Sequence, residues 1–192
     1  PRNLVQQRIR ALIVGIPKQI TSADTRVAMT PAGVEIMQQN RHPVLIEKQA
    51  GEPSGFEDAD YEHAGAEIVA SSKDIFNRSE MILRVKEPQT SEFDGLKEDQ
   101  IYFSYLHLAA SEKLTHTLIE TGSINIAYET IQKDDGSLPL LKPMSEVAGP
   151  MAIQEGAKYL EMAQGGHGVL LGGVPGVDPA TVVILGGGVV GG

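Results

Sequence analysis

The sequence predicts an α/β protein built on a doubly wound, mostly parallel sheet. Three observations support this prediction. Short apolar runs recur along the chain with little polar alternation, as strands that are buried on both faces require. Segments with helical periodicity and capping residues alternate with these runs, and a glycine-rich stretch follows the last run. The expected strands are 11–16, 44–47, 81–85, 101–106, 124–128 and 182–185.

Three helix starts can be placed from capping residues. Thr30 stands before Pro31, and proline suits the first position of a helix because its ring fixes φ and it has no amide to leave unpaired. Ser71 and Ser111 precede two further helical segments, where a serine hydroxyl can accept a bond from an unpaired amide. Gly122 supplies a stop for the last of these helices, because glycine readily adopts left-handed backbone angles.

A turn-rich cluster at 132–137 separates this alternation from the rest of the chain. Ser145 is the expected cap of a long helix that runs to about Met162. Pro150 lies inside this helix, where the missing amide and the ring clash cost roughly 3 kcal/mol. We therefore expect either a kink at Pro150 or a regular helix that begins near residue 149.

The composition changes after the long helix. Of the 21 glycines, 11 lie in residues 165–192, and no Lys or Arg follows Lys158. A chain of 192 residues suffices for one large domain or for one and a half small ones. We predict a first domain at 1–140 and, at 141–192, an interdomain helix followed by the start of a second domain. Because the chain begins with Pro1 and stops in a glycine-rich loop, we expect a processed, trimmed or partial sequence.

Charge and hydropathy disfavour several classes of protein. A net charge of −9 disfavours sequence-independent binding to nucleic acid, which needs a basic face. No window reaches the roughly 18 consecutive apolar residues of a membrane span. The chain contains no cysteine, which excludes a disulfide framework and a thiolate metal site, and its histidines lack metal-ligand spacing. The first twenty residues do not resemble a secretory signal, so we expect a cytoplasmic protein without a metal.

A glycine motif follows the last expected strand. Gly186, Gly188 and Gly191 have the G-x-G-x-x-G spacing directly after 182–185. In a Rossmann domain such glycines permit a tight turn, let the backbone approach a pyrophosphate, and let the next helix pack closely. The motif therefore indicates a dinucleotide site. A glycine-rich tail or linker is the alternative, because the completing helix and an acidic residue about 20 positions later are not in the chain.

Three polar residues follow expected strands at their carboxyl ends. Lys86 comes after 81–85, His107 after 101–106 and Glu129 after 124–128. Ligands of open parallel sheets bind outside the carboxyl ends of the strands, so a cation, an imidazole and a carboxylate could form one polar site there. The alternative is that Lys86 and Glu129 are solvated loop charges and that His107 is a capped loop histidine.

Arg26 lies just ahead of the helix that starts after Thr30. A guanidinium can bind both oxygens of a carboxylate at once, so Arg26 is a candidate carboxylate clamp. On its position alone, it could equally be an ordinary surface arginine.

Seven short motifs are spread along the chain. They are Gly15-Ile-Pro-Lys-Gln, Arg26-Val-Ala-Met-Thr-Pro-Ala-Gly-Val, Gly51-Glu-Pro-Ser-Gly-Phe, Val85-Lys-Glu-Pro, Tyr105-Leu-His-Leu-Ala, Met144-Ser-Glu-Val-Ala-Gly and Leu171-Gly-Gly-Val-Pro-Gly-Val. Together they resemble the alanine dehydrogenases and, more loosely, the NAD-binding subunit of proton-pumping nicotinamide nucleotide transhydrogenases. The resemblance covers 11–191 in register, and the motifs at Lys86 and Tyr105 favour alanine dehydrogenase.

The resemblance implies a reaction and a role for each candidate residue. It implies reversible NAD-dependent deamination of L-alanine to pyruvate and ammonia by a homo-oligomer, hexameric in full-length members. Arg26 and Lys86 would bind the substrate carboxylate and carbonyl, and His107 would be the acid/base. Glu129 would support the site. The dinucleotide would contact Ser145, Gly186, Gly188, Val189 and Gly191.

Three departures from the family pattern leave other hypotheses open. Pro150 stands where the family usually has arginine, residues 1–10 extend beyond the usual start, and family members run to roughly twice this length. We expect this chain alone to be inactive, because a catalytic aspartate and the ribose-binding acid would lie beyond it. The alternatives are a transhydrogenase NAD-binding subunit and a non-catalytic truncated remnant.

Overall fold

The computed structural model of the chain describes residues 10–20 and 24–192. The part of the N-terminal extension at 1–9 thus lies outside the described residues. The strands are β1 (Val14–Ile16), β2 (Val44–Glu47), β3 (Glu67–Val69), β4 (Met81–Leu83), β5 (Ile101–Ser104) and β6 (Ile124–Ala127). The α-helices are α1 (Pro31–Gln39), α2 (Asp58–His63), α3 (Ser72–Arg78), α4 (Glu112–Glu120) and α5 (Lys142–Tyr159). Short 3₁₀ turns include η2 (Thr90–Gly95) and η3 (Leu108–Ala110).

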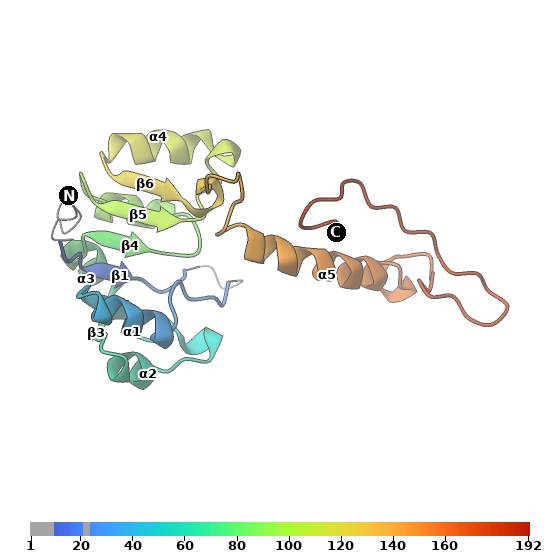
Figure 1. The fold of residues 1–192 in the computed structure, drawn as a ribbon, viewed down its shortest axis with the longest axis horizontal. Coiled ribbons are helices and arrows are strands. Elements are labelled where there is room, and N and C mark those ends of the chain that lie inside the picture. Colours follow the sequence, from blue (N-terminus) through green and yellow to red (C-terminus); the bar gives the residue numbers. More distant parts are fainter. Residues whose placement is uncertain (1–9, 21–23) are drawn as a thin grey trace, which may run out of the picture. The chain divides into compact units, whose positions relative to one another are not determined.

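The six strands form one parallel sheet in the order β3-β2-β1-β4-β5-β6 (Figure 1). The chain moves outward from β1 to β3, crosses back to β4 beside β1, and then moves outward to β6. This order, with helices between the strands, is that of a doubly wound Rossmann-like sheet, so the predicted fold class is confirmed.

Each face of the sheet has its own buried cluster. Val44 and Ile46 of β2 belong to the cluster that contains Val34 of α1 and Tyr61 of α2. Leu45, the residue between them, belongs to the other cluster, which includes Ile75 and Phe76 of α3 and Leu114 and Leu118 of α4. Alternate strand residues point to opposite faces, so helices on both sides of the sheet bury Val44, Leu45 and Ile46 alike, whereas Ile124 and Ile126 of the edge strand β6 are exposed. This burial explains why the strands read as nearly continuous apolar sequence.

The helix starts expected from capping residues are confirmed. The Thr30 hydroxyl accepts from the Gly33 amide, and the hydroxyls of Ser71 and Ser111 accept from amides three residues later. Gly122 follows α4 with φ +67°, a left-handed angle that suits glycine. These features are local, because the cap and the amide that it satisfies are close in sequence.

The strands differ from the prediction in length and number. β2 has the expected bounds, whereas β1, β4, β5 and β6 are one to three residues shorter than the apolar runs. Strand β3 is not predicted, because it is only three residues long and begins with the charged Glu67. Neither is α2, a single six-residue helix. The expected strand at 182–185 is wrong: these residues have no regular structure, and a strand forms only where another strand takes its hydrogen bonds.

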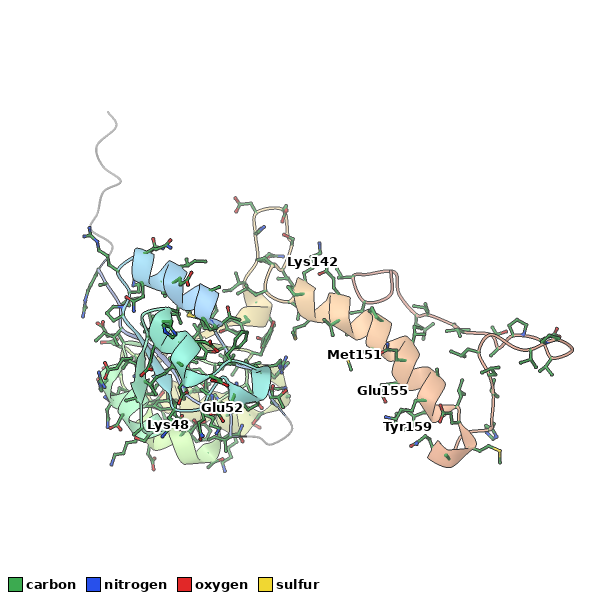
Figure 2. The ribbon with its side chains drawn as sticks, turned by 90° about the horizontal axis from the view of Figure 1, so that it is seen from below. Lys48, Glu52, Lys142, Met151, Glu155 and Tyr159 are labelled. Atoms are coloured by element: carbon green, nitrogen blue, oxygen red, sulfur yellow. The ribbon has the colours of Figure 1, made fainter. Side chains whose placement is uncertain are left out.

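The described chain divides into two compact units, residues 1–130 and 131–192. In the second, α5 begins at Lys142 with Leu141 at its cap position, so the prediction that Ser145 caps it is wrong. Ser145 instead lies in the first turns and donates its amide to the Leu141 carbonyl at 3.1 Å. Helix α5 continues through Pro150, and Figure 2 shows the side chains of Met151, Glu155 and Tyr159 projecting from it.

Among residues 10–20 and 24–192, no helix combines the length and the apolar character that crossing a membrane requires.

Candidate active site

Four predicted site residues lie beyond the carboxyl ends of strands in the first unit. Arg26 lies on the connection that follows β1, while Lys86, His107 and Glu129 follow β4, β5 and β6. All six strands are parallel, so these ends meet at one edge of the sheet. Strands β1 and β4 are neighbours whose connections leave in opposite directions, and a crevice at such a switch point is where doubly wound sheets bind ligands.

Arg26 is held by Asp24. The Arg26 Nε donates to Asp24 Oδ1 at 2.9 Å and Nη2 donates to Oδ2 at 2.6 Å. The Asp24 side chain is 8% exposed and that of Arg26 is 43% exposed. The guanidinium holds the pKa of Asp24 below its usual value, and the charge of Lys86 acts in the same direction. Asp24, which sequence reasoning missed, therefore lies within the electrostatic reach of both predicted substrate-binding cations.

Lys86 is half-buried on the segment that leaves β4. The segment remains attached to β5 beyond the end of the strand, because the Tyr105 amide donates to the Val85 carbonyl at 3.1 Å. The hydroxyl of Tyr102 donates to the carbonyl of Lys86 at 3.4 Å. The main chain of Lys86 is thus fixed by a buried neighbour, while its amine has four methylenes of reach.

His107 has an unusual backbone that Glu129 stabilises. Its φ of 48° and ψ of 39° are left-handed, a conformation in which histidine is more frequent than most residues. Glu129 Oε1 accepts from the His107 amide at 2.7 Å, and both carboxylate oxygens accept from the Leu106 amide at 3.2 and 3.3 Å. The carboxylate therefore holds the loop, and the imidazole of His107 is exposed.

Tyr105 links these groups and was also missed. Its ring lies nearly parallel to that of His107, with centroids 6.4 Å apart, and packs edge-on against Tyr128 at 5.0 Å. Burial raises the pKa of Tyr105, while the charge of Arg26 lowers it and that of Glu129 raises it further. Tyr105 thus interacts with three of the predicted site residues, with Arg26 and Glu129 through their charges and with His107 through its ring. Tyr105 follows β5 and precedes His107 by two residues, the signal by which it could have been found.

Two cavities meet at His107. One of about 340 Å³ extends toward Glu87, Gln89, Phe93 and Lys113. The other, of about 330 Å³, extends over Ala127 and Glu129. Each volume is sufficient for a small organic acid, and the walls offer both charged and apolar groups.

A buried ion pair lies behind the edge. Arg84 follows β4 directly and pairs with Glu92 of η2, and their side chains are 1% and 5% exposed. A charge inside the apolar run 81–85 was the available signal, but its partner could not be identified from sequence.

In the second unit, the glycine loop forms a tight turn. Gly186 has φ +102°, a Cβ on Gly191 would lie 2.1 Å from the Gly186 carbonyl oxygen, and the Gly192 amide donates to the Gly188 carbonyl at 2.9 Å. A Cβ on Gly186 or Gly188 would meet nothing within 4 Å. Val189 is exposed in this turn. The backbone of Gly186 and Gly188 is therefore open to an approaching phosphate, although the expected preceding strand is not formed.

The part of the chain that the structure describes holds no group of three or more His, Asp or Glu side chains that could bind a metal ion.

Comparison with known proteins gives consistent matches. The family model "Alanine dehydrogenase/PNT, N-terminal domain" matches residues 15–148, and the corresponding C-terminal domain model matches 152–192. The chain is 57% identical over 180 residues to an alanine dehydrogenase of Methanococcus maripaludis, which covers 94% of this chain and 48% of that protein. It is 50% identical over 178 residues to an alanine dehydrogenase of Mycobacterium tuberculosis, covering 93% and 48%.

Solved structures agree with the sequence matches. An L-alanine dehydrogenase structure superposes with a TM-score of 0.84 at 52% identity, covering 94% of this chain and 50% of that one. A transhydrogenase from Sinorhizobium meliloti superposes with a TM-score of 0.68 at 25% identity, covering 77% and 42%. The chain spans about half the length of the curated relatives that it matches.

Proposed function

Because this chain belongs to the alanine dehydrogenase/PNT family of oxidoreductases, we propose that its complete gene product oxidises L-alanine to pyruvate and ammonia with NAD. In balanced form, alanine, NAD⁺ and water give pyruvate, ammonium, NADH and a proton, and the reaction is reversible. The observation that carries the proposal is the 57% identity to an alanine dehydrogenase over 94% of this chain. The proposal is also supported by the position of Arg26, Lys86 and His107, which all follow strands at the same edge of the sheet.

We assign the two cations to the substrate. Arg26 binds the carboxylate of alanine or pyruvate, with Asp24 orienting its guanidinium. Lys86 polarises the carbonyl oxygen of pyruvate, because a cation stabilises the negative charge that develops there. Holding one small substrate at two points fixes the face of its reacting carbon, which is a large part of catalysis.

We assign proton transfer to His107. When bound, NAD accepts the hydride that leaves the substrate carbon. Water must then add to that carbon, and the exposed imidazole of His107 can take its proton as a general base. Glu129 supports this role through the main chain, since its carboxylate holds the His107 amide.

The glycine loop fits a dinucleotide phosphate. Gly186 and Gly188 leave open space on the side where a Cβ would stand, and Gly191 is required by the tight turn. We assign Gly186, Gly188, Val189 and Gly191 to the phosphate loop, and Ser145 of α5 to a further cofactor contact. The same proposal divides the chain into a substrate domain at 1–140 and the start of an NAD-binding domain at 141–192.

The transhydrogenase NAD-binding subunit is a second candidate, favoured by the structural match to the Sinorhizobium meliloti protein. A purified complete gene product that forms NADH from L-alanine and NAD, with D-alanine as a matched control, supports the dehydrogenase. Reduction of NADP only with a partner subunit would indicate the transhydrogenase instead. Absence of both activities would support a non-catalytic remnant.

The 192-residue chain is assayed in parallel, and we expect it to show no turnover and weak NADH binding. Residues 182–185 pair with no strand among the described residues, so the glycine loop is not held at the end of a sheet. Tight stoichiometric binding of NADH would contradict this expectation. We further propose that the complete gene product is a cytoplasmic homo-oligomer, hexameric as in full-length family members. Light scattering measures its oligomeric state, and fractionation of cells tests its location.

A further inference from the structure

Arg84 lies between the loop that carries Lys86 and the segment that follows β1. Its side chain is 1% exposed and lies directly beyond β4, two residues before Lys86. Its Nη2 donates to the Lys18 carbonyl at 3.0 Å and to Gln19 Oε1 at 3.2 Å. Lys18 and Gln19 lie on the connection that follows β1. One buried guanidinium therefore joins the two sides of the switch point.

The ion pair also closes the loop that carries Lys86. Arg84 Nη1 donates to Glu92 Oε1, and the second oxygen of Glu92 accepts from the Gln89 amide at 2.9 Å. Residues 84–92 thus form a loop whose two ends are tied together, and Lys86 lies inside it. One end of the loop therefore cannot move relative to the other without breaking a buried charge pair.

A third contact reaches the main chain of Lys86. The buried Tyr102 hydroxyl donates to the Lys86 carbonyl. It also lies beside the Arg84 guanidinium, whose charge lowers the pKa of Tyr102 against the raising effect of burial. Arg84, Tyr102 and Lys86 therefore form a continuous chain of contacts from the ion pair to the site.

Stability alone is a poor explanation for this arrangement. A buried ion pair can often be replaced by well-packed apolar residues without loss of stability, because desolvation offsets the attraction between the charges. Moreover, Arg84 Nε is buried without a hydrogen-bond partner in the described structure. What an apolar pair could not supply is a set of directional bonds to Lys18, Gln19 and Glu92 at once.

We propose that Arg84 is a positioning residue that fixes the loop of Lys86 against the segment that follows β1, and so places the Lys86 amine for the substrate carbonyl. The proposal rests on the proposed alanine dehydrogenase activity. It predicts that losing Arg84 weakens binding of the organic acid selectively, because the cofactor loop lies in the other unit of the chain. A misplacement of about 1 Å at a reacting group can lower activity by roughly a hundredfold.

The test uses the complete gene product with Arg84→Met, Arg84→Lys and the double variant Arg84→Met/Glu92→Gln. The double variant covers the case in which Arg84→Met alone leaves Glu92 buried and unpaired and fails to fold. Arg78→Met is the matched control, because Arg78 makes an exposed ion pair with Glu67, with hydrogen bonds of 2.8 and 2.6 Å. Thermal unfolding and the KM values for pyruvate and NADH are measured for each.

We expect KM for pyruvate to rise about tenfold to a hundredfold in the Met variants while KM for NADH stays within about twofold. Arg84→Lys, which keeps a cation within reach of Glu92, restores most of the pyruvate KM, and Arg78→Met leaves both values unchanged. A lower melting temperature with an unchanged pyruvate KM would overturn the proposal, as would an equal rise for NADH or no rescue by lysine. Wild-type protein without turnover would instead overturn the proposed function, and this inference with it.

Discussion

Residues 44–46 and 182–185 are both short runs of β-branched and aliphatic residues, yet only the first run is buried. In the first, Val44, Leu45 and Ile46 are buried in the middle of the sheet and belong to clusters on both faces. In the second, all four side chains are exposed, and that of Leu185 is 95% exposed. Both units thus contain an apolar run, but only the run in the first unit is buried.

The comparison shows which structures a segment can form by itself. Helix α5 has no buried residue among those described, but it forms because its backbone hydrogen bonds are internal. A strand has no such internal bonds, so 182–185 stays irregular where β2, placed between β1 and β3, is regular. The sheet also positions the polar residues of the first unit, because main-chain hydrogen bonds hold the segments that follow the ends of the strands.

The largest expected effect tests whether catalysis depends on the first unit. In the complete gene product, Lys86→Ala and His107→Ala should each lower kcat/KM by about 10²–10⁴, because a positioned cation and a proton-transfer group are lost. Lys158→Ala and His167→Ala, from the second unit, are the controls and should stay near wild type. Steady-state rates and circular dichroism check this, and near-normal turnover in either test variant would remove that residue from the mechanism.

A second prediction concerns the stability of the 192-residue chain. Ile82 of β4 is fully buried, so Ile82→Ala should lower the free energy of unfolding by about 2–5 kcal/mol. Leu185→Ala removes a nearly fully exposed side chain and should change it by less than about 0.5 kcal/mol. Urea unfolding followed by circular dichroism measures both. If Leu185→Ala lowered the free energy of unfolding as much as Ile82→Ala, the contrast in burial between the two units would be contradicted.

The smallest effect depends on pH and compares Asp24 with Asp135. Arg26 holds the pKa of Asp24 below its usual value, so the charged form contributes stability at neutral pH that is lost as pH falls from about 3.9 through the lowered pKa. Asp24→Asn should therefore destabilise the chain at pH 7 by about 1 kcal/mol or less, since Arg26 is 43% exposed and the pair is screened, and the difference should vanish in acid.

Asp135 provides the control from the second unit. Hydrogen bonds from Ser137 lower its pKa as well, but it has no cationic partner of this kind and is fully exposed. Between neutral and acid pH, the effect of Asp135→Asn on the unfolding midpoint should change less than the effect of Asp24→Asn. Equal pH profiles for the two variants would show that the Asp24–Arg26 pair does not contribute through its charge.

What could be predicted from the sequence is mostly local. Helix starts at Thr30, Ser71 and Ser111 follow from a cap and an amide within three residues of each other. The parallel sheet follows from apolar runs, and with it the placement of Lys86, His107 and Glu129 at one edge. The predictions that Ser145 caps α5 and that 182–185 forms a strand are wrong for the same reason. A capping residue or an apolar run forms the expected structure only when the neighbouring chain supplies its hydrogen-bond partners.

What could not be predicted depends on contacts between distant residues. Glu129 reaches the His107 amide across 22 positions, and Arg84 reaches Lys18 across 66. The sequence identifies the charged residues but does not pair them, since pairing depends on which strands become neighbours. The same reason explains why Asp24 and Tyr105 were missed: their importance comes from the groups that the sheet brings beside them.

The strand order also has a consequence for how the protein acquires its site during synthesis. Strand β1 is made first but pairs with β4, and Ile13 donates to the Glu80 side chain 67 residues later. Closing so large a loop is entropically costly, and long-range parallel pairing makes folding slow. A ribosome-bound chain that stops short of β4 lacks the β1–β4 pair, beyond which the connections of Arg26 and Lys86 begin. This part of the sheet edge is therefore completed only after the strands on the outer side of β1 have been made.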